Sequence, residues 1–263
     1  MKKGISVIIC CYNSESRLPK TLAALSLQLF KEPINWEIVL VDNASTDHTS
    51  IDGPRIWALN NNGVPFRIEY ESAPGLSYAR KKGIQSANYP ILVFCDDDNW
   101  LGPNYLQNVY SIFEKNPSIA ACGGKGLPAF EQNPPPYWFN EYSEAFALGS
   151  QEITREKGRL LNLYGAGLAI KKDVLSKLFD SGFEPILSDR VGTALSSAGD
   201  TELTNALVLR GFELYYSEAL IFSHFMPSAR LTKDYLNRLF TSFGTDGPIR
   251  NLYYSYLSQR FFH

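Results

Sequence analysis

The chain has 263 residues, of which 44% are hydrophobic and 20% charged, and its formal net charge is −2. A chain of this length can bury a large core, and the composition is typical of a globular protein. The near-zero charge argues against nucleic-acid binding, which normally brings a basic excess or a basic stripe. Because no apolar run approaches about 18 residues, we also expect no membrane-spanning helix.

The four cysteines, Cys10, Cys11, Cys95 and Cys122, form no CxxC pair. Three of them (Cys10, Cys95 and Cys122) lie in or at the end of apolar runs, which favours buried, reduced thiols over disulfides or a zinc site. The N-terminal apolar run is too short for a signal peptide, and no small-residue cleavage site follows it. These features predict a cytoplasmic protein.

The first 125 residues alternate between apolar runs and helical patterns. Strands are predicted at residues 5–10, 36–41, 66–71 and 91–95. Helices are predicted at residues 14–29, 76–87 and 103–116, the last with a proline in its first turn. Alternation of strands and helices predicts a mostly parallel sheet with helices on its faces.

The first predicted helix has a clear apolar face. Its leucines recur at helical spacing, at Leu18, Leu22, Leu25 and Leu29. Asn13 or Ser14, just before this pattern, is a candidate N-cap.

Polar segments follow three of the predicted strands, at residues 11–13, 42–47 and 96–99. In open α/β sheets, ligands bind outside the carboxyl ends of the strands. The three segments are therefore expected to meet at one edge of the sheet, and two of them are acidic. This edge is the predicted site.

The character of the chain changes after residue 125. Residues 127–142 are rich in proline and aromatic side chains, which is more typical of a lid or binding loop than of a regular element. Residues 164–175 indicate a glycine-rich turn, a short strand and the start of a helix. Residues 199–211 predict a helix with Asp200 as N-cap and Gly211 as its stop.

The C-terminal part is predicted to hold two short extended pieces over 212–224, ending at His224, and then a helical tail. We divide the chain into two halves of one domain (1–125 and 126–227) and an amphipathic helical tail (228–263).

Three consecutive carboxylates, Asp96, Asp97 and Asp98, come directly after a strand that is predicted to be buried on both faces. Like charges crowded at the rim of a core repel one another. A hard divalent cation, Mg²⁺ or Mn²⁺, would make the cluster tolerable, and such cations commonly combine carboxylates with phosphate oxygens. A nucleoside diphosphate is therefore the expected ligand. Asp42 is placed to bind its base or ribose, and Tyr12 to stack on the base.

Five segments carry a family resemblance: "SVIICCYNSESRL", "EIVLVDNASTD", "GLSYARKKGI", "ILVFCDDDNWLGPNYL" and "GDTELTNALVLRGFELYYSEALIFSH". Together, over residues 4–225, they resemble the family 2 glycosyltransferases of the GT-A fold. The resemblance implies a Rossmann-like, mostly parallel central sheet with flanking helices. It also implies transfer of a sugar from a nucleotide-sugar donor to an acceptor hydroxyl, with inversion. The first half of the domain (1–125) would then bind the donor, and the second half (126–227) would bind the acceptor.

The resemblance implies roles for individual residues. Tyr12 and Asp42, with Cys11 beside them, would hold the base, and Arg80 would face the ribose or diphosphate. The DXD element falls on Asp96 to Asp98, with Asp97 facing the ribose.

Asp98 would be a ligand of Mn²⁺ or Mg²⁺, and His224 matches a position that reaches the metal in some members. Asp200 would be the general base. Many members carry Glu-Asp where this chain has Gly199-Asp200, so one carboxylate of that pair is missing.

Structural roles compete with these assignments. Asp42 can cap the following turn, and Asp200 can cap its helix. Arg80 can belong to a solvated helix face, Tyr12 can be a rim aromatic, and His224 can simply be packed.

The tail mixes basic residues, Arg230, Lys233, Arg238, Arg250 and Arg260, with many aromatic ones. It can pack on the domain, or it can rest on the inner face of a membrane, which would suit a lipid-linked saccharide acceptor. A role in surface polysaccharide biosynthesis is expected from the resemblance.

Three other functions are alternatives to glycosyl transfer. A haloacid-dehalogenase-type phosphatase also places aspartates after a strand, but its motif has Thr or Val where this chain has Trp100. A sugar nucleotidyltransferase would need a glycine-rich, arginine-bearing loop after the first strand. A non-catalytic nucleotide-binding scaffold would tolerate loss of Asp98 or Asp200, yet both are present.

Overall fold

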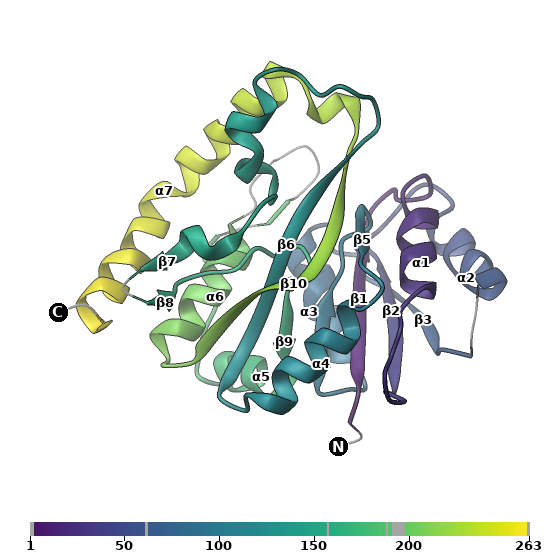
Figure 1. Cartoon of the computed structure of the whole chain (residues 1–263), viewed down its shortest axis with the longest axis horizontal. Coiled ribbons are helices and arrows are strands. Elements are labelled where there is room, and N and C mark those ends of the chain that lie inside the picture. The colour runs from purple at the N-terminus through teal and green to yellow at the C-terminus, as the bar shows by residue number, and fades with distance from the viewer. Residues whose placement is uncertain (1–2, 61–62, 157, 188, 191–197, 262–263) are drawn as a thin grey trace.

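The computed structural model describes residues 3–60, 63–156, 158–187, 189–190 and 198–261. It has a mixed α/β fold built on an eight-stranded sheet, with a separate two-stranded hairpin formed by β7 and β8 (Figure 1). The strands are β1 (Ile5–Cys11), β2 (Trp36–Asp42), β3 (Phe66–Tyr70), β4 (Ile91–Phe94), β5 (Asn99–Leu101), β6 (Ile119–Phe130), β7 (Arg155–Glu156), β8 (Arg159–Leu160), β9 (Ala169–Lys171) and β10 (Glu213–Met226).

The α-helices flank the sheet, and the longest of them, α7, runs along the outer side of α6 (Figure 1). They are α1 (Leu18–Ser26), α2 (Thr49–Asn60), α3 (Leu76–Ser86), α4 (Tyr105–Lys115), α5 (Lys172–Asp180), α6 (Gly199–Leu209) and α7 (Lys233–Phe261). Short 3₁₀ helices are η1 (Phe139–Phe146), η2 (Gln151–Thr154) and η3 (Ser228–Arg230). In the part of the chain that the structure describes, no helix combines the length and the apolar character needed to cross a bilayer.

The strand order is β3-β2-β1-β4-β9-β6-β10-β5. The first four strands are parallel, as are β6 and β10, whereas β9 is antiparallel to both of its neighbours and β5 is antiparallel to β10. The carboxyl ends of β1, β2 and β4 therefore lie side by side. That is the edge at which the sequence places its polar segments.

The core has two layers because successive strand residues point to opposite faces of the sheet. Ile5, Val7 and Ile9 of β1 join the cluster under α1 and α4, while Ile8 joins the cluster under α3, α5 and α6. The sheet is thus covered on both faces, which explains why its strands are continuously apolar. All four cysteines lie in described parts of the chain and are free thiols, as predicted.

The first helix is shorter than predicted. It begins at Leu18 with Arg17 as its N-cap residue, so neither Asn13 nor Ser14 caps it, and it ends at Ser26. Leu18, Leu22 and Leu25 are fully buried as expected, but Leu29 lies beyond the helix and is exposed. The Ser14 hydroxyl instead bonds to Asp97, and this contact holds the preceding loop against the acidic edge.

In two regions the local sequence pattern does not predict the observed secondary structure. Helix α2 was not predicted, because Gly53 and Pro54 interrupt its pattern and only three of its residues are buried. In place of the two short pieces predicted over 212–224 there is one long strand, β10 (Glu213–Met226), whose pairing with β6 has two register shifts. Its partner β6 extends to Phe130, so the predicted lid over 127–142 is partly strand and partly η1.

The helix that carries Asp200 also begins differently from the prediction. Ala198 is the N-cap residue, and Asp200 lies in the first turn of α6, so Asp200 is not the cap. The predicted stop is confirmed: the helix ends at Leu209, and Gly211 follows with a φ of 89°, a conformation that favours glycine.

Candidate active site

The three carboxylates after β4 have three different sets of partners, and Asp96 Oδ2 accepts from Asn99 Nδ2 at 3.0 Å. Asp98 Oδ2 accepts from Arg230 Nη2 at 2.9 Å, and Asp98 Oδ1 lies 3.5 Å from His224 Nε2. Asp97 Oδ2 accepts from Arg17 Nη2 at 2.7 Å and from the Ser14 hydroxyl. The partners on different elements explain how three adjacent carboxylates are tolerated at the rim of the core.

The three carboxyls are not electrostatically equivalent. Burial alone would raise the pKa of Asp98, but His224 and Arg230 hold it well below its usual range, so Asp98 is ionised. Burial and the charge of Asp98 raise the pKa of Asp96 and of Asp97, with Arg80 opposing the first shift and Arg17 the second. Of the three carboxyls, Asp98 is thus the one whose charged form the surroundings stabilise most.

His224, on β10, presents a defined nitrogen to Asp98. Its Nδ1 lies 2.9 Å from the carbonyl oxygen of Phe146, which can only accept a hydrogen bond, so Nδ1 carries the proton. The other ring nitrogen, Nε2, lies 3.5 Å from Asp98 Oδ1 and 3.2 Å from Arg230 Nη1. This is the second-sphere arrangement that orients metal-ligating histidines.

The ends of β1 and β2 form the neighbouring part of the edge. Tyr12 is 50% exposed, whereas Asp42 is only 3% exposed, and Asp42 Oδ1 accepts from the Ser45 backbone N–H at 3.0 Å. Cys11 is buried in the core cluster, so its thiol does not reach the edge. The two loops are tied together by Asn43, whose backbone N–H donates to the Cys11 carbonyl at 2.8 Å.

Arg80, on α3, reaches inwards and does not belong to a solvated helix face. Its Nη1 donates to Asp189 Oδ2 at 2.9 Å, and both side chains are largely buried. Burial would lower the pKa of Arg80, but Asp189, Asp200 and Asp96 raise it above its usual value. The guanidinium is thus held among three carboxyls.

Asp200 lies next to this arginine. Its Oδ2 accepts from the Gly165 backbone N–H, and a Cβ placed on Gly165 would lie 2.7 Å from Arg80 Nη2 and 2.9 Å from Asp200 Oδ2. The close approach explains the glycine at position 165. Burial raises the pKa of Asp200 to about 6, with Asp189 adding to the rise and Arg80 opposing it. A carboxyl of this pKa is suited to proton transfer near neutral pH.

The structure adds three residues that the sequence reasoning did not place in the site: Arg17, Asp189 and Arg230. Arg230 had been considered only as part of a basic tail, and Asp189 lies in a stretch without any pattern. A cluster of carboxylates requires cations nearby, but nothing in the local spacing indicates which arginines supply them.

The described residues contain no group of three His, Cys, Asp or Glu side chains that could hold a metal ion by itself. Asp98 and His224 supply a carboxylate oxygen and an imidazole nitrogen, a donor pair that suits Mn²⁺ or Mg²⁺ when phosphate oxygens complete the coordination. The residues present therefore fit a cation that arrives with a diphosphate.

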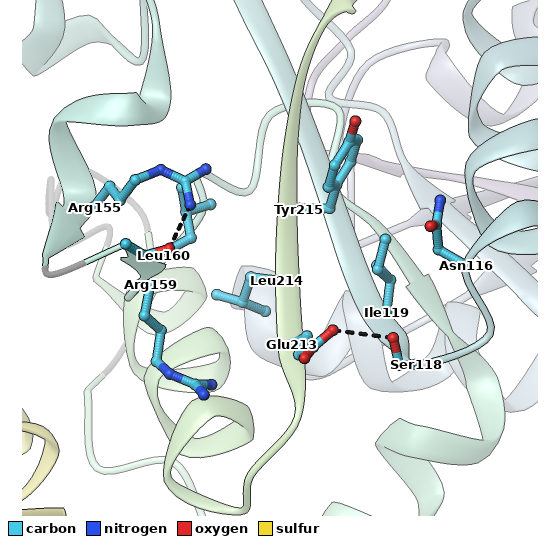
Figure 2. A pocket seen from close by; sticks show the side chains of 10 residues that line it. Asn116, Ser118, Ile119, Arg155, Arg159, Leu160, Glu213, Leu214 and Tyr215 are labelled. Carbon is cyan, nitrogen blue, oxygen red and sulfur yellow. Dashed lines mark hydrogen bonds between the residues drawn. The ribbon is translucent and has the colours of Figure 1, made fainter. Parts of the chain in front are cut away.

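A separate pocket of about 460 Å³ lies at the opposite end of β6 and β10 (Figure 2). Arg155 and Arg159 on the β7–β8 hairpin line one side, and Glu213 and Tyr215 of β10 line the other. Glu213 bonds to the Ser118 hydroxyl at 3.0 Å. Because β10 begins at this pocket and reaches the acidic edge only near its end, at His224, the two sites are distinct.

Comparison with known proteins places the chain in a family. The family described as "Glycosyl transferase family 2" matches residues 6–179, and the chain belongs to this family. The glucosyl-dolichyl phosphate glucuronosyltransferase of Haloferax volcanii is 23% identical over 178 residues, which cover 65% of this chain and 53% of that protein. The poly(ribitol-phosphate) beta-glucosyltransferase of Bacillus spizizenii is 27% identical over 157 residues, covering 57% and 24%. The matches thus span about half of these relatives or less.

Solved structures confirm the predicted GT-A fold. The mannosyltransferase PcManGT from Pyrobaculum calidifontis, in complex with GDP-Man and Mn²⁺, has a TM-score of 0.63 and 18% identity, covering 98% of this chain and 70% of that one. S. aureus TarS 1–349 in complex with UDP has a TM-score of 0.60 and 18% identity, covering 85% and 60%. At this identity the likeness concerns the fold.

Proposed function

We propose that this chain is an inverting glycosyltransferase that moves a sugar from a nucleotide-sugar donor to an acceptor hydroxyl, with Mn²⁺ or Mg²⁺ as cofactor. The main support is the position of Arg80, which interacts electrostatically with Asp200 on one side and with Asp96 on the other. A carboxyl with a pKa of about 6 therefore lies beside the edge that would accept the diphosphate.

Asp200 would act as the general base. Its ionised carboxylate accepts the proton of the acceptor hydroxyl while the hydroxyl oxygen forms a bond to the anomeric carbon. The bond between that carbon and the diphosphate oxygen breaks on the opposite face, and its electron pair leaves with the diphosphate. The configuration at the anomeric carbon is thereby inverted.

The leaving diphosphate gains negative charge as this bond breaks. Asp98 and His224 would hold the divalent cation, which when bound stabilises that charge. Arg80 would contribute further positive charge from α3, and its ion pair with Asp189 fixes its orientation. The ion pair of Asp97 with Arg17 would reduce repulsion between that carboxylate and the donor.

We infer that UDP is a better donor nucleotide than GDP, with Tyr12 stacking on the base and Asp42 binding it, next to the backbone of Cys11. Related folds bind either class, because the TarS structures contain UDP or UDP-GlcNAc and the PcManGT structure contains GDP-Man. Asp97 would face the ribose from its position beside Arg17.

The acceptor would be a saccharide or a lipid-linked saccharide in surface polysaccharide biosynthesis, handled in the cytoplasm. Tyr137 is 87% exposed and can form part of an acceptor wall, while Trp138 is buried in a cluster with η1 and α7. Contact of α7 with the inner face of a membrane stays a prediction. Arg230 does not support it, because its guanidinium is directed inwards to Asp98.

Calorimetric titration with UDP and with GDP, each with and without Mn²⁺, tests the proposal on the wild type and on Asp98→Asn. We expect Mn²⁺-dependent binding of one nucleotide and its loss in the variant. A matched control is Asp173→Asn, because Asp173 is an exposed carboxylate of α5, paired only with Lys177 among the ion pairs found.

Turnover of the bound nucleotide-sugar then separates an enzyme from a scaffold. Nucleotide binding without transfer to any saccharide acceptor would favour the scaffold. Absence of nucleotide binding in a folded protein would remove the roles given to Asp98 and His224. Membership of glycosyl transferase family 2 already argues against a phosphatase.

A further inference from the structure

Arg230 occupies the place between the two side chains that would hold the cation. It is the last residue of η3, immediately after β10. Its Nη2 lies 2.9 Å from Asp98 Oδ2, and its Nη1 lies 3.2 Å from His224 Nε2. The Arg230 side chain is 19% exposed and that of Asp98 is 5% exposed, so this contact is largely shielded from water.

The guanidinium of Arg230 thus contacts both side chains that would ligate the cation. The neutral form of His224 is the one that can ligate a metal, and in it Nδ1 carries the proton and Nε2 accepts the hydrogen bond from Arg230. Arginine has several N–H groups in a fixed fork, which allows it to bind the carboxylate and the imidazole at the same time. The lone pairs that bond to Arg230 are not available to a divalent cation, and two positive charges at this spacing repel each other.

Release of these atoms does not require η3 to unfold. The backbone of η3 is held independently, because the Ser228 N–H donates to Glu131 Oε2 at 2.7 Å and the Leu231 N–H donates to the Ser228 carbonyl at 3.0 Å. Only the flexible Arg230 side chain has to turn. Its planar fork also suits the oxygens of a phosphate, which it can bind in a bidentate manner.

We propose that Arg230 is a resident counter-cation that holds Asp98 and His224 in the donor-free protein and moves to the diphosphate when a metal-bound nucleotide arrives. This inference rests on the proposed function. It makes metal and nucleotide binding interdependent: the cation alone must displace Arg230 without compensation, whereas the complete donor offers the arginine new oxygens. Linkage then requires each ligand to strengthen the binding of the other.

The test measures binding of Mn²⁺ alone, by the electron paramagnetic resonance signal of the free ion, on the wild type and on Arg230→Gln. Removing the competing charge is expected to tighten Mn²⁺ binding on the order of tenfold, the equivalent of one charge-assisted hydrogen bond. Lys233→Gln is the matched control, because it removes an exposed positive charge three residues further along and should leave Mn²⁺ binding unchanged. In the presence of saturating Mn²⁺, Arg230→Gln should bind UDP or GDP more weakly than the wild type.

Arg230→Lys provides a second variant if the glutamine variant does not fold. A lysine keeps the charge but loses the fork that binds both atoms, so tighter binding of Mn²⁺ alone than in the wild type is expected.

Wild-type affinity for Mn²⁺ alone in the folded variants would overturn the inference. If nucleotide binding still required Asp98 and Mn²⁺, the proposed function would survive. If the wild type bound no nucleotide under any condition, both the inference and the proposed function would be overturned.

Discussion

Asp189 occupies the space into which a side chain at position 199 would project. A Cβ atom on Gly199 would lie 2.6 Å from Asp189 Oδ1 and 2.8 Å from its Cγ. In this chain the Asp189 carboxylate fills that space and pairs with Arg80. The family resemblance implies a glutamate at position 199 in many members, and we propose that Asp189 supplies the carboxylate in its place.

This relationship predicts that Gly199→Ala is disruptive although alanine normally favours helices. The new Cβ would displace the Asp189 carboxylate from Arg80, at an overpacking cost of about 1–3 kcal/mol in the free energy of unfolding. Thermal unfolding and nucleotide binding should both show the loss. Gly244→Ala, in α7, is the matched control, because a Cβ there meets no atom within 4 Å. Equal behaviour of the two variants would contradict the steric argument.

Exchange of the two positions is a stricter test of the same relationship. Gly199→Glu alone should impair donor binding, because the glutamate and Asp189 compete for one space. Combining it with Asp189→Gly leaves a single carboxylate and should recover much of the lost binding. A double variant that is worse than either single variant would show that Asp189 has no counterpart role.

The pKa of about 6 for Asp200 predicts the pH profile of transfer. The base must be ionised, so kcat/KM should rise tenfold per pH unit below about 6 and become level above it. Asp200→Asn should lower kcat by roughly 10² or more, the usual contribution of a general base. An unchanged profile in that variant would exclude Asp200 as the base.

The raised pKa of Asp200 also makes the stability of the protein depend on pH. The folded-state pKa lies above the ordinary value of 3.8, so the contribution of Asp200 to stability is fully present below pH 3.8 and is lost as the pH rises to about 6. Urea denaturation at several pH values should therefore show an additional decline over this range in the wild type compared with Asp200→Asn. Parallel curves would mean that the carboxyl is not perturbed.

We predict that Glu37, which lies away from the candidate site, contributes to the free energy of unfolding. This carboxylate is 2% exposed within β2 and accepts from Ser6 Oγ at 2.7 Å, Asn88 N at 2.7 Å and Arg67 Nη2 at 3.2 Å. Glu37→Ala leaves the buried Ser6 hydroxyl without its acceptor and removes the ion pair with Arg67, so it should cost about 1–3 kcal/mol, measured by urea denaturation. Glu114→Ala, which removes an exposed partner of Lys3, should cost no more than about 1 kcal/mol. Similar losses in both would contradict the role of burial.

Membrane contact can be tested on the outward side of α7. Leu252 and Tyr256 lie four residues apart and are 56% and 61% exposed. If α7 rests on lipid, Leu252→Ser with Tyr256→Ser should reduce co-sedimentation with anionic vesicles. Equal recovery of the variant and the full wild-type chain in the pellet would remove this prediction.

The sequence alone determined the part of the fold that depends on local pattern. Strands β1, β2 and β4 are continuous apolar runs, and a strand buried on both faces can hardly have another composition. Their order with the helices implied a parallel arrangement, which in turn placed Tyr12, Asp42 and the three aspartates at one edge. Where the local signal was weak, as at Gly53 and Pro54 in α2, the prediction missed the element.

Only the tertiary structure decided how the charges are distributed at that edge. Asp98 meets Arg230 because β10 runs beside β5 and η3 follows it, and Arg80 meets Asp189 through the approach of a loop to α3. Each ion pair joins segments far apart in the chain, and no short-range periodicity encodes such a pairing. The physical reason is that clustered carboxylates need positive charges within a few ångströms, whereas the packing of the whole domain determines which arginines supply those charges.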